Sequence, residues 1–317
     1  MAQRDGSHQI GILIYPGAQL SAVHGLTDLF ETANRLRVER GASSTGLAVQ
    51  HWPAEDGLPP TVAPLTALIL PPSLRGEVPS DQVGPLVAWT LDRHGEGTLL
   101  CSVCAGAFLL AETGLLAGRV ATTHWALAAR FAERFPDVKL DTNKLIIDDG
   151  DIVTAGGLMA WVDLGLKLID RFIGPAIMLA TARLFLVDPG GREQRFYSSF
   201  VPHLTHGDTV ILKVQHWLQA KNGEKITLPL MAAEAGLGER TFLRRFHKAT
   251  GLKPAQYLQH LRVGKARDML ELSALAVDEI AWRVGYEDPG AFRKIFRRVM
   301  GLSPGEYRRR FAVRQET

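Results

Sequence analysis

The sequence predicts two domains of different fold class, a doubly wound α/β sheet followed by an all-α domain. Three observations support this division. Short apolar runs alternate with helical patterns over the first 187 residues, which is typical of a parallel sheet covered by helices. A tract near the C-terminus occurs twice as an internal repeat, and both copies have helical periodicity. A length of 317 residues favours two domains, and an apolar fraction of 46% is enough for two cores.

The expected α/β domain covers residues 1–187. Uninterrupted apolar runs predict buried strands, and apolar residues three or four positions apart predict helices. The expected strands are 10–15, 47–52, 65–70 and 98–103, and the expected helices are 21–38, 81–94, 106–113, 158–172 and 175–186. Shorter strands are expected between residues 138 and 154, on either side of an acidic turn at 148–151.

The boundary between the domains is expected in residues 188–207. This segment has no sustained period and is rich in glycine, proline and serine, which predicts a linker. Residues 208–317, which begin with a helix at 208–220, hold 20 lysines and arginines against 12 aspartates and glutamates. Residues 1–207 hold 16 against 21. A cationic surplus confined to the part of the chain that contains the repeat indicates a polyanion-binding domain.

The duplicated tract comprises residues 231–257 and 280–307. Five residues recur at an offset of fifty: Phe242 and Phe292, Phe246 and Phe296, Gly251 and Gly301, Pro254 and Pro304, and Tyr257 and Tyr307. In each copy a short apolar helix (229–235 or 277–284) stops at a glycine and a second helix follows. Two helices joined by a short glycine turn predict a helix-turn-helix, whose second helix enters the DNA major groove.

The second helix of each copy has one apolar and one cationic face. The phenylalanines must face a core, so the opposite face is predicted to contact double-stranded DNA. The predicted contact residues are Arg240, Thr241, Arg244, Arg293, Lys294 and Arg297. Of these, Arg240, Arg244, Arg293 and Lys294 are expected to reach base edges. Arg245 and Arg298 are expected to point sideways, toward phosphates or acidic neighbours.

The C-terminal tract resembles the DNA-binding domain of the AraC/XylS family of bacterial transcriptional regulators. The resemblance is carried by Gly285-Tyr286, by Phe292-Arg-Lys-Ile-Phe296 and by Gly301-Leu-Ser-Pro-Gly-Glu-Tyr-Arg308. It implies seven helices over about the last hundred residues. It also implies that a long helix at 255–272 holds the two DNA-reading helices one DNA turn apart.

Cys104 and His124 are the residues of the first domain with the strongest chemical signal. Cys104 follows the strand at 98–103 and precedes the helix at 106–113, a sharp turn that exposes a side chain at the sheet edge. A helix N-terminus can lower a thiol pKa there, and a histidine can deprotonate the thiol. The spacing from Cys101 is C-x-x-C, but the chain has two cysteines, so no zinc site and no cofactor are predicted.

This part of the chain resembles the PfpI/ThiJ superfamily, whose fold is like that of class I glutamine amidotransferases and flavodoxin-like. The matching stretches are Cys104-Ala-Gly106, Leu109-Leu-Ala111, Gly114-Leu-Leu-Ala-Gly118 and Ala121-Thr-Thr-His124-Trp125. A domain of this kind before an AraC-type domain resembles the GlxA-type regulators. That resemblance implies a domain that binds a small effector and forms a homodimer, with Cys104, Ala105, His124 and Trp125 at the effector pocket.

Two departures from the superfamily argue against catalysis. No carboxylate is present near Ser21, where the enzymes carry a glutamate beside the cysteine. Pro72-Ser73 replaces a Gly-Gly that helps to stabilise an oxyanion, and proline has no N–H to donate. We therefore predict no catalytic residues and interpret Cys104 and His124 as vestigial.

Other classes of protein remain open from the sequence. A PfpI/ThiJ-type cysteine hydrolase or deglycase with a DNA-binding tail is one, and a non-specific nucleoid-type DNA binder is another. The first domain is alternatively a purely structural, dimerising domain. The polar start of the chain and the absence of long apolar stretches predict no membrane association and a cytoplasmic location. The effector is not identified by the sequence.

Overall fold

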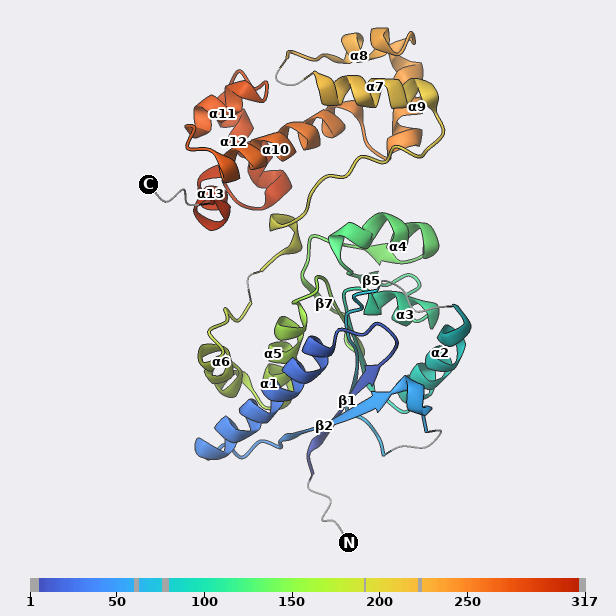
Figure 1. Ribbon diagram of the computed structural model, residues 1–317, viewed down its shortest axis with the longest axis vertical. Coiled ribbons are helices and arrows are strands. Elements are labelled where there is room, and N and C mark those ends of the chain that lie inside the picture. Colours follow the sequence, from blue (N-terminus) through green and yellow to red (C-terminus); the bar gives the residue numbers. More distant parts are fainter. Residues whose placement is uncertain (1–5, 60–62, 76–79, 191, 222–223, 314–317) are drawn as a thin grey trace. The chain divides into compact units, whose positions relative to one another are not determined.

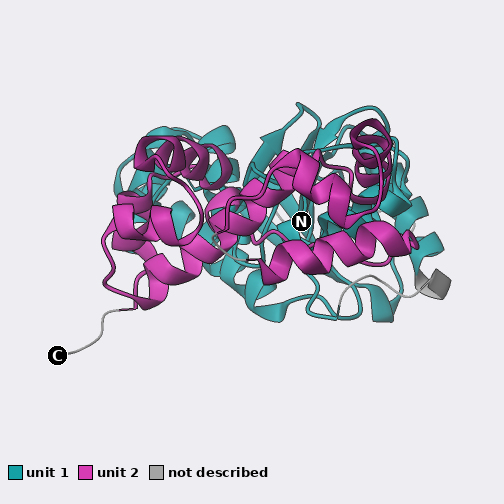
Figure 2. Ribbon diagram, turned by 90° about the horizontal axis from the view of Figure 1, so that it is seen from above, with its two compact units in different colours: residues 1–194 teal, residues 195–317 magenta. Residues whose placement is uncertain are grey.

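The computed structural model describes residues 6–59, 63–75, 80–190, 192–221 and 224–313 (Figure 1). The chain divides into two compact units, Met1–Gln194 and Arg195–Thr317, which Figure 2 shows in different colours. The division falls inside the segment that the sequence suggested as a linker, at residues 188–207.

Unit 1 is built on a six-stranded sheet with the order β2-β1-β3-β4-β8-β7. Its strands are β1 (His8–Ile14), β2 (Leu47–Pro53), β3 (Ala67–Leu70), β4 (Leu99–Val103), β7 (Ile146–Asp148) and β8 (Ile152–Ala155). The pairs are parallel except at the edge strand β7, which runs antiparallel to β8. The predicted doubly wound sheet is confirmed.

Helices cover both faces of this sheet (Figure 1). One core lies under α1 (Leu20–Glu39), α5 (Trp161–Phe172) and α6 (Pro175–Leu184). A second core lies under α2 (Ser80–Gly95), α3 (Gly106–Glu112) and α4 (Ala128–Arg134). In β1 Ile12 belongs to the first core and its neighbour Leu13 to the second, because successive side chains of a strand point to opposite faces.

A few elements of unit 1 differ from the sequence expectation. The helix expected from residue 158 begins at Trp161, after a turn in which Gly157 has a φ of 93°. A positive φ of this kind is accessible to glycine, so the chain turns there before the helix starts. The short strands β5 (Val120–Ala121) and β6 (Lys139–Leu140) pair with each other in a separate two-stranded sheet.

The described residues of unit 2 form the seven α-helices that the resemblance implied. They are α7 (Thr209–Ala220), α8 (Leu228–Glu234), α9 (Glu239–Thr250), α10 (Pro254–Leu272), α11 (Val277–Arg283), α12 (Pro289–Met300) and α13 (Pro304–Phe311). Two separate cores result, one around α7, α8 and α9 and the other around α11, α12 and α13. The start of α10 packs into the first core and the rest of it into the second, so α10 joins two lobes.

Candidate functional site

The two helix-turn-helix motifs of unit 2 are α8–α9 and α11–α12. Each turn contains a glycine with positive φ, 64° at Gly236 and 87° at Gly285. Each second helix ends at a left-handed glycine, Gly251 or Gly301. Left-handed residues at these points satisfy the last helical carbonyls and reverse the chain, which is why glycine occupies them in both copies.

Phenylalanine pairs orient the second helix of each motif. Phe242 and Phe246 of α9 are fully buried, as are Phe292 and Phe296 of α12. The sequence of buried, half-buried and exposed positions is the same in residues 241–249 and in residues 291–299. The buried rings therefore fix which face of α9 and of α12 is turned to solvent, and it is the same face in both.

The six predicted DNA contacts all lie on exposed positions of α9 and α12. Within the described residues, the side chains of Arg240, Thr241, Arg244 and Lys294 take part in no hydrogen bond or ion pair. Hydrogen bonds from Ser303 lower the pKa of Glu306, and the positive charge of Arg297 lowers it further.

Arg293 differs from the other predicted contacts. Its guanidinium is ion-paired with Asp278 of α11, the first helix of the same motif. At an offset of fifty the matching residue of α9 is Leu243, which is apolar. The second motif thus carries an ion pair at a place where the first motif carries a leucine, and the Arg293 guanidinium predicted to reach a base edge is engaged by Asp278.

Two further arginines were expected to point sideways, and both have protein partners. Arg245 donates to Asp208 through Nε at 3.0 Å and through a terminal nitrogen at 2.7 Å, and this pairing lowers the pKa of Asp208. Asp208 also accepts the backbone N–H of Ile211 as the N-cap of α7. Arg298 donates to Gln259 of α10 at 2.7 Å. Both arginines therefore hold helices of unit 2 together.

Cys104 and His124, the candidate pair of unit 1, have different partners in the structure. Cys104 occupies the turn between β4 and α3 with a φ of 54°, a strained conformation for a residue other than glycine. Burial raises the pKa of its thiol to about 11, so the thiol is protonated at neutral pH. The Nδ1 atom of His124 accepts the backbone N–H of Ala126, and burial lowers the pKa of the ring. Among the described residues no hydrogen bond joins the two side chains.

One residue beside this turn was missed by sequence reasoning. Gln194 is buried, and its side-chain oxygen accepts the backbone N–H of Trp125 at 3.1 Å. It lies at the end of unit 1, within a stretch that the sequence suggested as linker. Gly156 makes room for it, because a Cβ there would lie 1.8 Å from the Gln194 amide nitrogen. No sequence signal marks this pairing, since the two residues are far apart in the chain.

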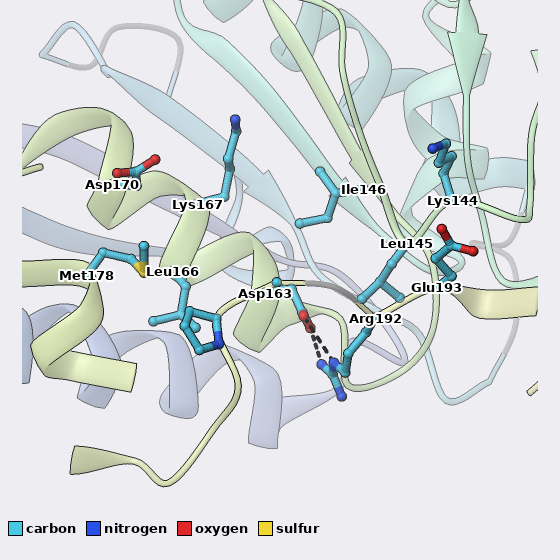
Figure 3. A pocket seen from close by; sticks show the side chains of 12 residues that line it. Lys144, Leu145, Ile146, Asp163, Leu166, Lys167, Asp170, Met178, Arg192 and Glu193 are labelled. Atoms are coloured by element: carbon cyan, nitrogen blue, oxygen red, sulfur yellow. Dashed lines mark hydrogen bonds and ion pairs between the residues drawn. The ribbon is translucent and has the colours of Figure 1, made fainter. Parts of the chain in front are cut away.

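A cavity was also missed. It lies in unit 1 at the edge strand β7, has a volume of about 380 Å³, and is lined by residues of α5, α6 and the segment that follows α6 (Figure 3). None of the four predicted effector-pocket residues lines it. Among the described residues, no group of three histidine, cysteine, aspartate or glutamate side chains is placed to bind a metal.

Family comparisons match both units. A model of the DJ-1/PfpI family matches residues 73–171, and a helix-turn-helix domain model matches residues 231–310. The chain thus combines a DJ-1/PfpI-type domain with an AraC-type helix-turn-helix domain, which confirms the two resemblances found in the sequence. No helix of the described residues is both long and apolar enough to cross a membrane.

Individual relatives are regulators by name. The chain is 28% identical to the HTH-type transcriptional regulator ArgR of Pseudomonas aeruginosa, over 95% of this chain and 92% of that protein. It is 28% identical to the regulator GbdR of the same species over 67% of this chain, and 27% identical to the regulator GlxA of Rhizobium meliloti over 68%. These last two matches span 58% of GbdR and 66% of GlxA.

Proposed function

We propose that this protein is a sequence-specific, DNA-binding transcriptional regulator that responds to a small-molecule effector bound by unit 1. The observation that carries the proposal is the duplicated cationic surface of α9 and α12, set by buried phenylalanines on the two lobes that α10 joins. Exposed arginines without protein partners suit base edges and phosphates. The names of the relatives support the same function.

The proposal includes a homodimer formed through unit 1, a cytoplasmic location and no catalytic activity. The Cys104 thiol is protonated at neutral pH and has no histidine partner among the described residues, which favours a sensor over a cysteine hydrolase or deglycase. An activity assay with a Cys104→Ala control separates the two classes. Turnover that disappears in the variant would establish the enzyme, whereas an unchanged promoter response without turnover supports the sensor.

Arg244 tests the DNA-reading function directly. Footprinting on genomic fragments identifies a preferred site, and Arg244→Ala should then lose about 1–3 kcal/mol of discrimination at one base pair of that site, because a bidentate arginine–guanine contact is removed. Lys248→Ala is the matched control, an exposed cation in the last turn of α9. Equal weakening on every sequence would make Arg244 a phosphate contact, and the absence of any preferred site would favour the nucleoid-type binder.

A further inference from the structure

The cavity at the sheet edge of unit 1 has three walls. Lys144, Leu145 and Ile146 form the wall on the β7 side, and α5 and α6 form the second. The third is formed by Pro189, Gly190, Arg192 and Glu193, near the end of unit 1 (Figure 3). A volume of about 380 Å³ falls within the range of about 300–1,000 Å³ found for small-molecule sites.

The charged side chains around the cavity include three cations and three anions. Arg192 is ion-paired with the buried Asp163, and Lys167 with Asp148 at 3.1 Å. Asp170 and Lys144 differ from these, because neither forms a hydrogen bond or an ion pair through its side chain within the described part of the chain. Asp170 is half-buried, and a partly desolvated carboxylate without a partner favours a cation beside it.

Apolar side chains separate these two charges. In the view of Figure 3, Asp170 lies beside Met178 and Lys167 at one end of the cavity, and Lys144 lies at the other end. Leu166 lies with Asp170 at the first end, and Ile146 and Leu145 lie between that end and Lys144. The lining therefore complements a molecule with a positive end, an apolar body and a negative end.

We propose that this cavity is the effector site and that it binds a small zwitterion. The ammonium group of the ligand pairs with Asp170, its carboxylate with Lys144, and its hydrocarbon body covers Leu145, Ile146 and Leu166. The proposal rests on the regulator function proposed above. It assigns the effector to this cavity rather than to the turn at Cys104. In the cavity the ligand contacts the chain that leads to the DNA-binding unit.

Residues 192–194, here called the strap, attach that chain to the body of unit 1. Arg192 pairs with Asp163 of α5, and its Nε donates to the carboxylate at 3.1 Å. Glu193 forms an antiparallel β-bridge with Lys144, a residue of the cavity wall. The backbone N–H of Gln194 donates to the carbonyl of Asn143 at 3.1 Å. A ligand that orders Lys144 and Asp170 also orders the surface on which the strap lies.

The side chain of Gln194 extends the strap to the turn at Cys104. Its amide nitrogen lies 2.9 Å from the carbonyl of Thr123 and 3.0 Å from the carbonyl of Lys144. The hydroxyl of Thr123 in turn donates to the carbonyl of Cys104 at 2.7 Å. Gln194 is the last residue of unit 1, so an occupied cavity stabilises the attached strap, and the empty cavity allows it to detach more often.

Ligand binding is tested on the full-length protein with ω-amino acids of increasing length, from β-alanine through 4-aminobutanoate to 6-aminohexanoate. At least one is expected to raise Tm in a concentration-dependent way up to about 10 mM, since a ligand that binds only the folded state stabilises it. Hexanoate and hexylamine, each with one of the two charges, should give no shift at the same concentration. Equal shifts with either of them, or none with any zwitterion, would overturn the proposal.

The site is located with charge-removing variants. Asp170→Asn and Lys144→Gln should each weaken binding of the active zwitterion at least tenfold, because each removes one ion pair to the ligand. Asp137→Asn, which changes an exposed carboxylate that does not line the cavity, is the matched control. If His124→Ala abolishes binding while Asp170→Asn retains it, the effector binds at the Cys104 turn and the cavity assignment is wrong.

The coupling between zwitterion binding and DNA affinity is tested through Gln194. Gln194→Met keeps the side-chain volume but removes its hydrogen bonds, and should bind the zwitterion while its DNA affinity no longer changes on ligand addition. Gly156→Ala is a second route to the same result, because its Cβ displaces the Gln194 amide while the residues of the strap keep their identity. An unaltered ligand response of DNA affinity in both folded variants would show that the strap is not the route.

Negative results of the ligand experiments and of the DNA experiments contradict different proposals. A wild-type protein that binds a specific site but no zwitterion contradicts only the cavity assignment. A protein that binds the zwitterion through Asp170 but prefers no DNA sequence contradicts the regulator function instead.

Discussion

Cys104 has the backbone position of a nucleophile and the environment of an inert thiol. It lies at the turn between β4 and α3, as the sequence predicted, but its side chain is buried, whereas the sequence predicted an exposed one. Burial then raises the pKa of the thiol, and this outweighs the backbone hydrogen bonds from Ala105 and Gly157 that lower it. Position in a fold and chemical reactivity are therefore separate properties of this residue.

Slow alkylation of Cys104 follows from that environment. A pKa of about 11, against an ordinary value of 9.0, makes the thiolate about 100-fold scarcer at pH 8, and only the thiolate reacts. Iodoacetamide labelling followed by peptide mass spectrometry should show this retardation, or a larger one because the side chain is also buried. The protein unfolded in guanidinium is the control and should react at the ordinary rate. Rapid labelling of folded protein at Cys104 would revive the enzyme alternative.

At the scale of elements, α9 and α12 depend on the lobe that each completes. Phe246 contacts Tyr257 of α10 edge-on, with ring centroids 5.3 Å apart, and Phe296 contacts Tyr307 of α13 at 5.6 Å. The hydroxyl of each tyrosine is hydrogen-bonded, to Gln215 and to Glu271. The orientation of the cationic face of each helix therefore depends on the aromatic core against which the helix packs.

Truncating one of these rings should weaken DNA binding without touching the DNA-facing surface. Phe246→Ala should cost about 3–5 kcal/mol of stability, because a fully buried ring is replaced by a cavity. Leu243→Ala, one turn away on the exposed side of α9, is the control and should change stability by less than about 0.5 kcal/mol. Chemical denaturation measures both. A small effect of Phe246→Ala would mean that the first lobe does not rely on this core.

For the whole molecule, the two parts of the chain carry opposite net charge. Residues 208–317 hold 20 basic against 12 acidic residues, whereas residues 1–207 hold 16 against 21. Binding to a polyanion releases counterions, so the affinity of the cationic part for DNA must fall as salt rises. The acidic part is suited instead to its own ligand and, in our proposal, to a second copy of itself.

The salt dependence of DNA binding tests this charge division. The logarithm of the association constant should fall linearly with the logarithm of salt concentration, and Arg297→Ala should flatten the slope by about 0.9, the contribution of one phosphate contact to B-DNA. Fluorescence anisotropy at several KCl concentrations measures the slope. Asp268→Asn, which removes an exposed charge on α10, is the comparison variant. A slope unchanged by Arg297→Ala would place Arg297 away from the phosphates.

Local patterns were sufficient for most elements of both units, although neither β5 nor α4 was expected from the sequence. The strands β1, β2 and β4 and the helices α7 to α13 lie within a few residues of their expected positions. The exception at α5 has a local cause, because Gly157 turns the chain before the helix starts. Helical periodicity, glycine turns and proline starts act over a few residues, so the sequence alone carries this information.

The sequence by itself determined the two fold classes, the duplicated helix-turn-helix and the cationic face of each reading helix. Only the tertiary structure decided the partners: Asp278 for Arg293, Asp208 for Arg245, and the buried site beside Trp125 for Gln194. It also decided that a cavity forms beside β7 and that burial keeps the Cys104 thiol protonated at neutral pH. Periodicity is a property of neighbouring residues, whereas burial, ion pairing and cavities arise between segments that only folding brings together.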